Sequence, residues 1–350
     1  MKTLTSKKLV LLISLVLALL FSVGFVSAQC VNPTDDYLVN SDVTFCSGTF
    51  ELNDDGTPGI IIINADDVTV TCLGTVIEPG DGTSTLGINI TNHDNIVIDN
   101  CTVQGYDVGI MVTSDSSYVN ITNNTVIDSA TYPLKVSGNN SFVANNRLDY
   151  TGGDIALQID GSNGTFIENN ISGGYIDVTS TAIKNNISSN LILEEYMYIY
   201  LTGASNNNLE DNTISDGHMV LGPDANWNNI TGNNITILTN SDEYGILLYD
   251  ASNNTIKDNT LTNGDIYLEV NADWNYILHN TIDTSGTNAD YSVYLSSSDY
   301  NTIYNNTGNK PIRLSGADNS NVSENNITLS TYGYGIYLDS DNNFVEGNFL

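Results

Sequence analysis

The segment GILLYDASNNTIKDNTL, residues 245–261, holds both parts of a repeat that runs through most of the chain. The first part is a Gly-Ile-x-Leu block. The second, about eight residues later, is an apolar-x-x-Asn-x-apolar unit, and its copies recur with a mean period of about 22 residues. Cys101 stands in the Asn position of an early copy. The Asn positions of the other copies are Asn124, Asn146, Asn169, Asn185, Asn212, Asn233, Asn259, Asn280, Asn306, Asn325 and Asn348.

This repeat predicts a solenoid built from β-strands. The Gly-Ile-x-Leu blocks alternate between apolar and variable residues, which is the two-residue period of a strand. Clusters of Asn, Asp, Ser and Gly between the blocks are typical of turns. Each coil can bury its apolar side chains and stack on its neighbours at about 4.8 Å. The recurring Asn tolerates a left-handed turn and can hydrogen-bond to the Asn of adjacent coils, so it forms a ladder. We expect an all-β parallel solenoid with three short strands per coil.

The repeat also resembles a known family. The coil at 245–261, with the stretches at 65–74 and 96–103, is similar to the right-handed parallel β-helix of the pectate-lyase-like superfamily, and most similar to its NosD-like, "periplasmic copper-binding" group. The resemblance covers about residues 60–350. It implies a single right-handed β-helix of about 12–13 coils. The motif specifies the scaffold and says little about function.

The chain divides into three predicted parts. Residues 1–28 have the positive start, apolar run and small-residue cleavage site of a secretory signal peptide, so we expect export. Residues 29–65 are expected to cap the first coil, and residues 66–350 to form the β-helix. The last repeat ends at Leu350 with no capping segment, so we expect either that the sequence is a fragment or that its open C-terminal end docks onto another protein. No membrane span is predicted after the signal peptide.

Four cysteines lie in the first third of the exported chain, where oxidising conditions favour disulfides. By number alone they allow three pairings. When the chain is laid on the repeats that it resembles, Val70 matches Ile98. Cys72 and Cys101 then fall at nearly equivalent places in consecutive coils. The resemblance therefore favours a Cys72–Cys101 bond, with Cys30 and Cys46 joined in the segment before the first coil.

Charge and composition exclude several functions. The chain has 9 Lys and Arg against 41 Asp and Glu, a formal charge of −32, and it contains 50 Asn. Loss of the signal peptide removes three of the bases, so the exported charge becomes −35. Nucleic-acid binding needs basic residues to neutralise phosphates, so no nucleic-acid partner is expected. We interpret the acidic turns as a solvated coat that keeps an open solenoid from aggregating.

Few residues suggest catalysis or a resident cofactor. A polysaccharide lyase or hydrolase remains the alternative, because the superfamily contains such enzymes, but no catalytic residue is assigned. Copper needs clustered His, Cys or Met, and none are clustered in this sequence. Weak calcium binding by Asp and Asn turns fits the charge better, although no calcium motif is present and no metal ligand is assigned.

The outward position of the Gly-Ile-x-Leu block is the best candidate binding surface. Aromatic faces stacked on one sheet can bind sugar rings or a partner surface, or they can simply stabilise the sheet by packing across strands. Several Asn-x-Ser/Thr acceptors beside the ladder are also expected to point outward, where they could carry glycans. The binding candidates are Tyr200, Tyr267, Tyr294, Arg313 and Tyr337. The glycosylation candidates are Asn123, Asn170, Asn186, Asn234, Asn305 and Asn326.

The sequence therefore favours a secreted or cell-surface module that binds carbohydrate or partner proteins and does not cleave them. The alternatives are a polysaccharide lyase or hydrolase and a purely structural rod of the cell envelope.

Overall fold

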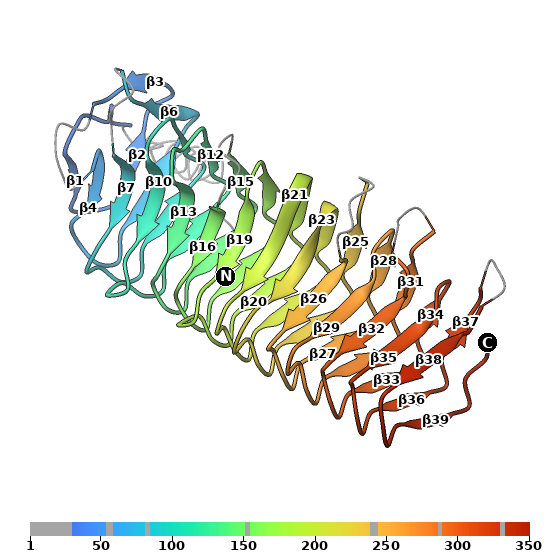
Figure 1. Ribbon diagram of the computed structural model, residues 1–350. Helices are drawn as coiled ribbons and strands as arrows, with labels where there is room; N and C mark the ends of the chain where they lie inside the picture. The colour runs from blue at the N-terminus through green and yellow to red at the C-terminus, as the bar shows by residue number, and fades with distance from the viewer. Residues whose placement is uncertain are drawn as a thin grey trace, which may run out of the picture.

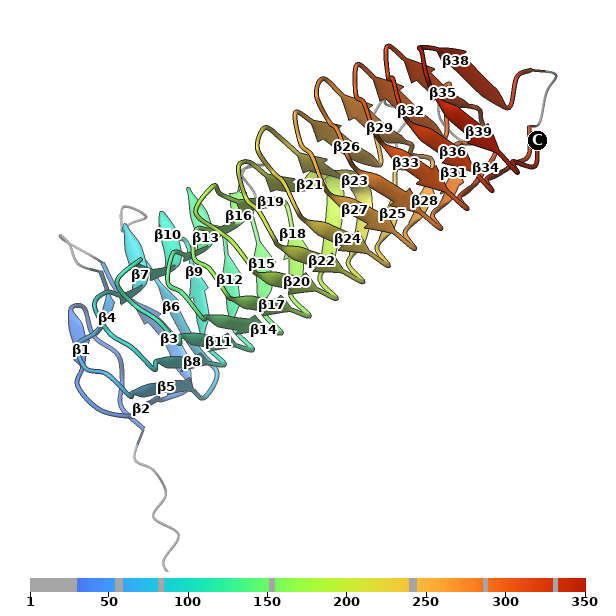
Figure 2. The ribbon, with the colours of Figure 1, turned by 90° about the horizontal axis from the view of Figure 1, so that it is seen from below.

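The computed structural model describes residues 30–53, 59–80, 85–150, 155–238, 244–285, 289–329 and 333–350. The predicted signal peptide lies outside these residues. The described chain winds into a long rod whose coils stack side by side, with β1 near one end and β39 at the other (Figures 1 and 2). No helix able to cross a membrane occurs in the part of the chain that the structure describes.

Three sheets run the length of the rod, and we number them in the order in which a coil passes through them. The first sheet carries the Gly-Ile-x-Leu blocks. Its strands are β1 (Tyr37–Val39), β4 (Ile61–Ile63), β7 (Leu86–Ile90), β10 (Val108–Val112), β13 (Tyr132–Val136), β16 (Ile155–Ile159), β19 (Tyr175–Val178), the ends of β21 (Leu191–Leu201) and β23 (Thr213–Leu221), β26 (Ile246–Tyr249), β29 (Ile266–Glu269), β32 (Val293–Ser296), β35 (Ile312–Ser315) and β38 (Ile336–Asp339).

The second sheet has 14 strands and begins each apolar-x-x-Asn unit. Its strands are β2 (Val43–Phe45), β5 (Thr69–Cys72), β8 (Val97–Asp99), β11 (Asn120–Thr122), β14 (Phe142–Ala144), β17 (Thr165–Ile167), β20 (Asn186–Ser188), β22 (Asn208–Glu210), β24 (Asn229–Thr231), β27 (Thr255–Lys257), β30 (Tyr276–Leu278), β33 (Thr302–Tyr304), β36 (Asn321–Ser323) and β39 (Phe344–Glu346).

The third sheet follows the ladder Asn and is continuous with the first, because β21 and β23 run through both. Its other strands are β3 (Gly48–Glu51), β6 (Thr75–Glu78), β9 (Thr102–Gln104), β12 (Thr125–Ile127), β15 (Arg147–Asp149), β18 (Asn170–Ser172), β25 (Asn234–Thr236), β28 (Thr260–Thr262), β31 (Thr281–Asp283), β34 (Thr307–Gly308) and β37 (Asn326–Ile327).

All strand pairs between coils are parallel, and the core is one continuous apolar column. In the coil of residues 245–261, Ile246 and Leu248 of β26, Ile256 of β27 and Leu261 of β28 are all fully buried. The alternation in the sequence therefore corresponds to the inward and outward faces of each strand. The expected right-handed parallel β-helix with three strands per coil is confirmed.

An Asn ladder runs along the corner between the second and third sheets. The Oδ1 atom of Asn169 accepts hydrogen bonds from both the backbone N and the Nδ2 of Asn146, each at 3.0 Å. The Nδ2 of Asn146 also donates to the carbonyl of Ile121 at 2.8 Å. Every polar group of the buried amide is thus satisfied, as burial requires. The same arrangement repeats at Asn124, Asn190, Asn212, Asn233, Asn259, Asn280, Asn306 and Asn325, and ends at Asn348.

One expected ladder member is wrong. The partner of Asn169 is Asn190, not Asn185, because Asn190 donates onward to Asn212 and accepts from Asn169. Asn185 belongs to a second ladder, five residues earlier in each coil, at the corner between the first and second sheets. Its members are Asn185, Asn207, Asn228, Asn254, Asn275 and Asn301, and Ser320 and Asn343 continue the column.

The left-handed turn also lies elsewhere than expected. The ladder Asn itself does not have a positive φ. The residue just before it does, as at Asn123 (57°), Asp258 (55°) and Glu324 (57°). The chain turns at the residue before the ladder Asn, because the ladder amide must point inward along the stack.

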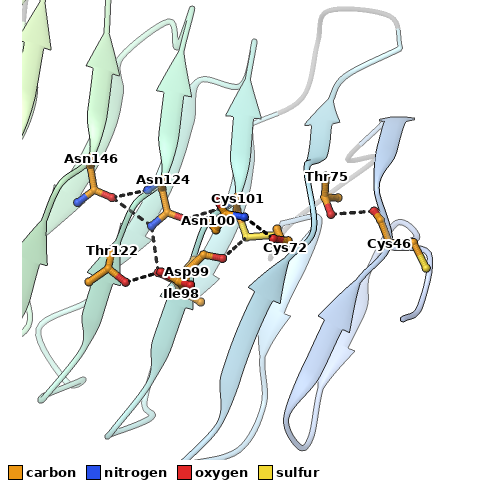
Figure 3. The surroundings of a disulfide bond; sticks show 10 residues. All are labelled: Cys46, Cys72, Thr75, Ile98, Asp99, Asn100, Cys101, Thr122, Asn124 and Asn146. Carbon is orange, nitrogen blue, oxygen red and sulfur yellow. Dashed lines mark hydrogen bonds between the residues drawn. A yellow bond between two sulfur atoms is a disulfide. The ribbon is translucent and has the colours of Figure 1, made fainter. Parts of the chain in front are cut away.

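Both expected disulfides are present, Cys30–Cys46 and Cys72–Cys101. Figure 3 shows the second bond beside the start of the first ladder, where the backbone N of Cys101 donates to Asn124 Oδ1 at 2.9 Å. Cys101 therefore occupies the ladder position and the disulfide replaces the missing amide contact. Parallel pairing begins already at β1, inside the segment 29–65 that was expected to be a cap.

Apolar side chains are exposed on the last described coil. Leu338 and Val345 are 44% and 42% exposed, whereas their partners one coil earlier, Leu314 and Val322, are fully buried. Docking of a partner at this end stays a prediction.

Candidate functional site

The outward residues of the first sheet form one column along the rod. Strand pairing aligns Tyr200, Val220, Leu247, Tyr267, Tyr294, Arg313 and Tyr337 in successive coils, in that order. In Figure 1 the strands that carry the last four of these residues, β29, β32, β35 and β38, lie next to one another in the orange-to-red part of the rod. The expected alignment is therefore present, but its members do not form one continuous aromatic surface.

The C-terminal half of the column and the tyrosines beside it form what we call the aromatic–arginine face. Its members are Tyr244, Tyr267, Tyr291, Tyr294, Arg313, Tyr334 and Tyr337. Tyr267 and Tyr294 stack with ring centroids 4.9 Å apart and an interplanar angle of 13°. The ring centroid of Tyr244 lies 4.7 Å from that of Tyr267, and the centroid of Tyr291 lies 5.1 Å from that of Tyr294. These rings are at the spacing of aromatic pairs that attract one another.

Arg313 is the centre of this face. Its guanidinium lies 5.1 Å from the ring of Tyr294, 5.3 Å from that of Tyr337 and 5.2 Å from that of Tyr291. Its Nη1 donates a 2.6 Å hydrogen bond to the Tyr291 hydroxyl, and this bond raises the pKa of Arg313. A planar cation held by three rings is pre-organised to meet a ligand without losing further side-chain entropy.

A pocket of about 340 Å³ opens beside Arg313. Its walls are Tyr291, Pro311, Arg313, Tyr334 and Tyr337. Tyr334 and Tyr337 are 76% and 43% exposed, so the rings at the rim face solvent. The size and the aromatic lining are those of a site for one small ligand or one unit of a polymer.

Two predicted residues behave differently from the rest. Tyr267 is only 8% exposed, because Tyr244 and Tyr294 cover it, and burial raises the pKa of its hydroxyl to about 12. Tyr200 is separated from Tyr267 by Val220 and Leu247 and lies 6.0 Å from Tyr198 in another aromatic group. Tyr267 is therefore a covered member of the aromatic–arginine face, and Tyr200 lies outside that face.

Three tyrosines of the face were not expected from the sequence. Tyr244, Tyr291 and Tyr334 each precede the outward position of their coil by three residues. That recurring spacing is the sequence signal that identifies them, and it lies outside the Gly-Ile-x-Leu block.

A row of polar residues borders the face on its other side. Strand pairing aligns Glu269, Ser296, Ser315 and Asp339, two residues after the outward column. Glu269 and Asp339 are three coils apart, or about 14 Å at strand spacing. Paired carboxylates of glycoside hydrolases lie no more than about 9.5 Å apart, so these two do not form such a pair.

A second group of polar residues lies in the N-terminal half of the first sheet. A groove of about 540 Å³ is lined in part by Lys135, Ser137 and Asp160. Lys135 Nζ lies 3.6 Å from Asp160 Oδ2, which also accepts a 2.8 Å hydrogen bond from Ser137. In the next coil Asp177 accepts from Gln158 at 3.3 Å, and burial raises the pKa of Asp177.

Most glycosylation candidates are accessible. Asn186 is half-buried, and the other acceptors are exposed, namely Asn123, Asn170, Asn234, Asn305 and Asn326. Whether any of them carries a glycan stays a prediction.

The residues present do not fit a copper site. All four cysteines are in disulfides. His93 is hydrogen-bonded to Asp66 and His279 to Asn305, in different parts of the rod. His218 stacks on Tyr198. Within the residues that the structure describes, no three His, Cys, Asp or Glu side chains converge as metal ligands.

Two family models match the chain. One, described as periplasmic copper-binding protein (NosD), matches residues 138–282 and 183–350. The other, described as right handed beta helix region, matches residues 30–192. No curated protein sequence matches the chain closely enough to count as a relative.

Solved structures share the fold at low sequence identity. The A-module of the Azotobacter vinelandii mannuronan C-5 epimerase AlgE6 is 15% identical, with a TM-score of 0.57, and the match covers 89% of this chain and 90% of that one. The pre-mature gene product 12 of bacteriophage phi29 is 11% identical, with a TM-score of 0.69, covering 96% and 57%. The tailspike protein of E. coli bacteriophage HK620, solved in complex with a pentasaccharide, is 11% identical, with a TM-score of 0.59, covering 87% and 74%.

These likenesses show a shared fold. The family model, which covers more than half of the chain, and the Asn-laddered coils show more: the chain belongs to the NosD family of right-handed parallel β-helix proteins.

Proposed function

We propose that this protein is an extracytoplasmic rod that binds polysaccharide along its first sheet, at the aromatic–arginine face. The observation that carries the proposal is the pocket beside Arg313, with exposed Tyr334 and Tyr337 at its rim. Aromatic ring faces stack on the apolar faces of sugar rings, and the fixed guanidinium donates to sugar hydroxyls or carboxylates.

The surroundings of the face support binding along a chain of sugars. Ser296, Ser315 and Asp339 border the rings with hydroxyl and carboxylate groups, which suit hydrogen bonds to sugar hydroxyls. The coils repeat at about 4.8 Å, so a linear polymer can meet an equivalent row of groups in each coil. The HK620 tailspike, which shares this fold, was solved with a pentasaccharide.

The location follows from the disulfides. Two disulfides indicate an extracytoplasmic protein, because thiols in the cytoplasm are kept reduced. Display at the cell surface is part of this proposal and rests on the predicted signal peptide.

A glycan array with matched variants tests the proposal. Combining Arg313→Gln with Tyr337→Ser should weaken the binding of a glycan that the wild type binds at least about tenfold, because both groups lie in the pocket wall. Tyr276→Thr is the control: Tyr276 is 49% exposed but lies on the second sheet, between Thr255 and Thr302 of adjacent coils. Full retention of glycan binding by the double variant would refute the assignment.

A second candidate function is polysaccharide hydrolysis beside the Lys135–Asp160 pair, at the edge of the groove that this pair lines. The observation that favours it is a carboxyl with a raised pKa, Asp177, one coil from the Lys135–Asp160 pair. In this scheme Asp177, whose pKa is raised by burial, is the general acid toward the glycosidic oxygen, while Asp160 accepts a proton from the attacking water. Release of new reducing ends by the wild type, lost in Asp177→Asn, would establish this activity, and no release from any polysaccharide bound on the array would exclude it.

A further inference from the structure

A second row of aromatic residues lies at the corner between the first and second sheets. Each coil has one left-handed residue there, just before the second Asn ladder, and its backbone N donates to the next coil. In most coils this residue is Asn, as at Asn140, Asn163, Asn206, Asn319 and Asn342. Three coils of the C-terminal half have Trp227, Trp274 and Tyr300 at the same position instead, with φ of 61°, 59° and 58°.

These aromatic residues are costly choices for the fold. A bulky residue at positive φ is strained, whereas Asn tolerates that conformation. Nor is the strain offset by burial, since Trp227 is 62% exposed, Trp274 51% and Tyr300 43%. The column uses Asn in most coils, Lys184 in one and Tyr118 in one far toward the N-terminus. Three strained, exposed aromatic residues gathered within four coils point to a binding role rather than a structural one.

The spacing of the row leaves room for one ring. Trp274 and Tyr300, in adjacent coils, stack with centroids 4.3 Å apart and planes only 3° from parallel. Trp227 and Trp274 are two coils apart, about 9.6 Å at strand spacing, and the position between them is Asn253. That interval is about twice the distance within the existing stack. A single ring placed over Asn253 would therefore continue the stack from Trp274 to Trp227.

The charge around this gap selects the ligand. Asp273 and Asp299 precede Trp274 and Tyr300, and Asp273 Oδ1 accepts a 2.6 Å hydrogen bond from the backbone N of Asp299. Asp224 and Asp250 lie at the same corner in the preceding coils. Carboxylates accept hydrogen bonds from sugar hydroxyls but repel acidic polymers.

We propose that Trp227 and Trp274 hold one pyranose ring of a neutral polysaccharide over Asn253. The sugar stacks its apolar faces on the two indoles, and its hydroxyls bond to the Asn253 amide and the neighbouring carboxylates. This site rests on the proposed carbohydrate-binding function, but it uses a different corner of the rod from the aromatic–arginine face.

The chain offers a direct readout, because its two tryptophans are the two residues of this site. Tryptophan emission of the full chain is measured during titration with cellohexaose, maltohexaose, N-acetylchitohexaose and hexagalacturonate. We expect at least one neutral hexasaccharide to shift the emission to shorter wavelength and to protect it from acrylamide, and hexagalacturonate to do neither.

Matched variants separate binding from folding. Trp227→Asn and Trp274→Asn each restore the residue that the column uses elsewhere, so both should unfold at or above the wild-type temperature. Each should weaken binding of the neutral hexasaccharide at least about tenfold, as expected for loss of one central aromatic contact. Calorimetry measures this affinity. Tyr118→Asn is the control, because Tyr118 is 56% exposed and left-handed in the same column but lies five coils before Trp227.

The possible results are decisive for this corner. Unchanged affinity in both Trp variants, no emission change with any neutral hexasaccharide, or a response to hexagalacturonate alone would each overturn the proposal. An emission response to a protein partner but to no sugar would overturn it as well. Glycan binding that is lost with Arg313→Gln and Tyr337→Ser but unaffected by the Trp variants would leave the proposed function standing and remove only this site.

Discussion

At the scale of the residue, the buried asparagine amide is the group on which the rod depends. The Oδ1 of Asn259 accepts two bonds from Asn233, and its Nδ2 donates to Asn280 and to the carbonyl of Ile230. No other side chain of this size offers two N–H donors together with a two-bond acceptor without a charge. The requirement for an uncharged amide explains why asparagine, rather than aspartate, recurs in this position.

Replacing one ladder amide should therefore destabilise the folded state. Asn259→Ala removes the acceptor of two hydrogen bonds from Asn233 and leaves the buried backbone N–H of Asn233 without a partner, so we expect a loss of about 3 kcal/mol in the free energy of unfolding. Urea unfolding followed by circular dichroism measures it. The control is Asn234→Ala at an exposed neighbour, which should cost less than about 0.5 kcal/mol. Equal effects of the two substitutions would show that the ladder does not stabilise the rod.

Asp265 predicts a pH dependence. It is buried, one carboxylate oxygen has no hydrogen-bond partner, and burial raises its pKa from 3.8 to about 7. The folded state therefore holds a proton that the unfolded chain releases near pH 4. Stability from this proton is complete below about pH 4 and is lost as the pH rises through 7, by about 4 kcal/mol in all.

The Asp265→Asn variant removes this titration. We expect it to be more stable than the wild type at pH 8, with the advantage shrinking toward pH 4.5, in denaturant unfolding at both pH values. Asp258→Asn at an exposed turn is the control, and its stability relative to the wild type should not change with pH in this way. A difference between wild type and Asp265→Asn that does not change with pH would contradict the burial of a protonated acid.

The sequence was informative at this scale only where one residue type repeats. The spacing of the first ladder is readable from the sequence, yet it also admits Asn185, because a second Asn column runs five residues earlier with nearly the same apolar frame. Which of two neighbouring Asn residues stacks on Asn169 depends on how the turn bends in three dimensions. That bend is set by the positive φ of the preceding residue, which has no single sequence signature.

At the scale of the element, each coil is a set of strands that is stable only when stacked. A coil buries four or so apolar side chains, as at Ile246, Leu248, Ile256 and Leu261, and its strand edges are satisfied by the coils on either side. Two-residue alternation predicted these strands well. It could not show how far Tyr267 is covered, because Tyr244 and Tyr294 come from neighbouring coils.

The disulfide at the start of the first ladder should stabilise the early coils. Cys72 and Cys101 are 29 residues apart, and such a bond contributes about 3 kcal/mol by restricting the unfolded chain. Cys72→Ala with Cys101→Ala should lose that amount in denaturant unfolding. Cys72→Ala with Cys101→Asn should recover about 1 kcal/mol, because the amide extends the ladder from Asn124. Identical stabilities of the two double variants would contradict the view that Cys101 occupies a ladder position.

At the scale of the whole molecule, negative charge is spread along the rod, whereas the proposed binding surfaces lie in its C-terminal half. The formal charge of −32 is spread over many turns, and only 9 Lys and Arg are present in the chain. Against that background Arg313 is a cation enclosed by tyrosines, and it lies where the outward column is most aromatic. The small number of Lys and Arg residues in the sequence argues against a catalytic function. The position of one base identifies the surface that we propose for binding.

The most direct test is the affinity of one bound glycan for the wild type and for the Arg313→Gln, Tyr337→Ser double variant, measured by calorimetry at matched salt. We predict that the double variant binds at least about tenfold more weakly, because a cation and an aromatic wall of the pocket are lost together. Its thermal unfolding should stay close to that of the wild type. Equal affinity of the two proteins for that glycan would contradict the account.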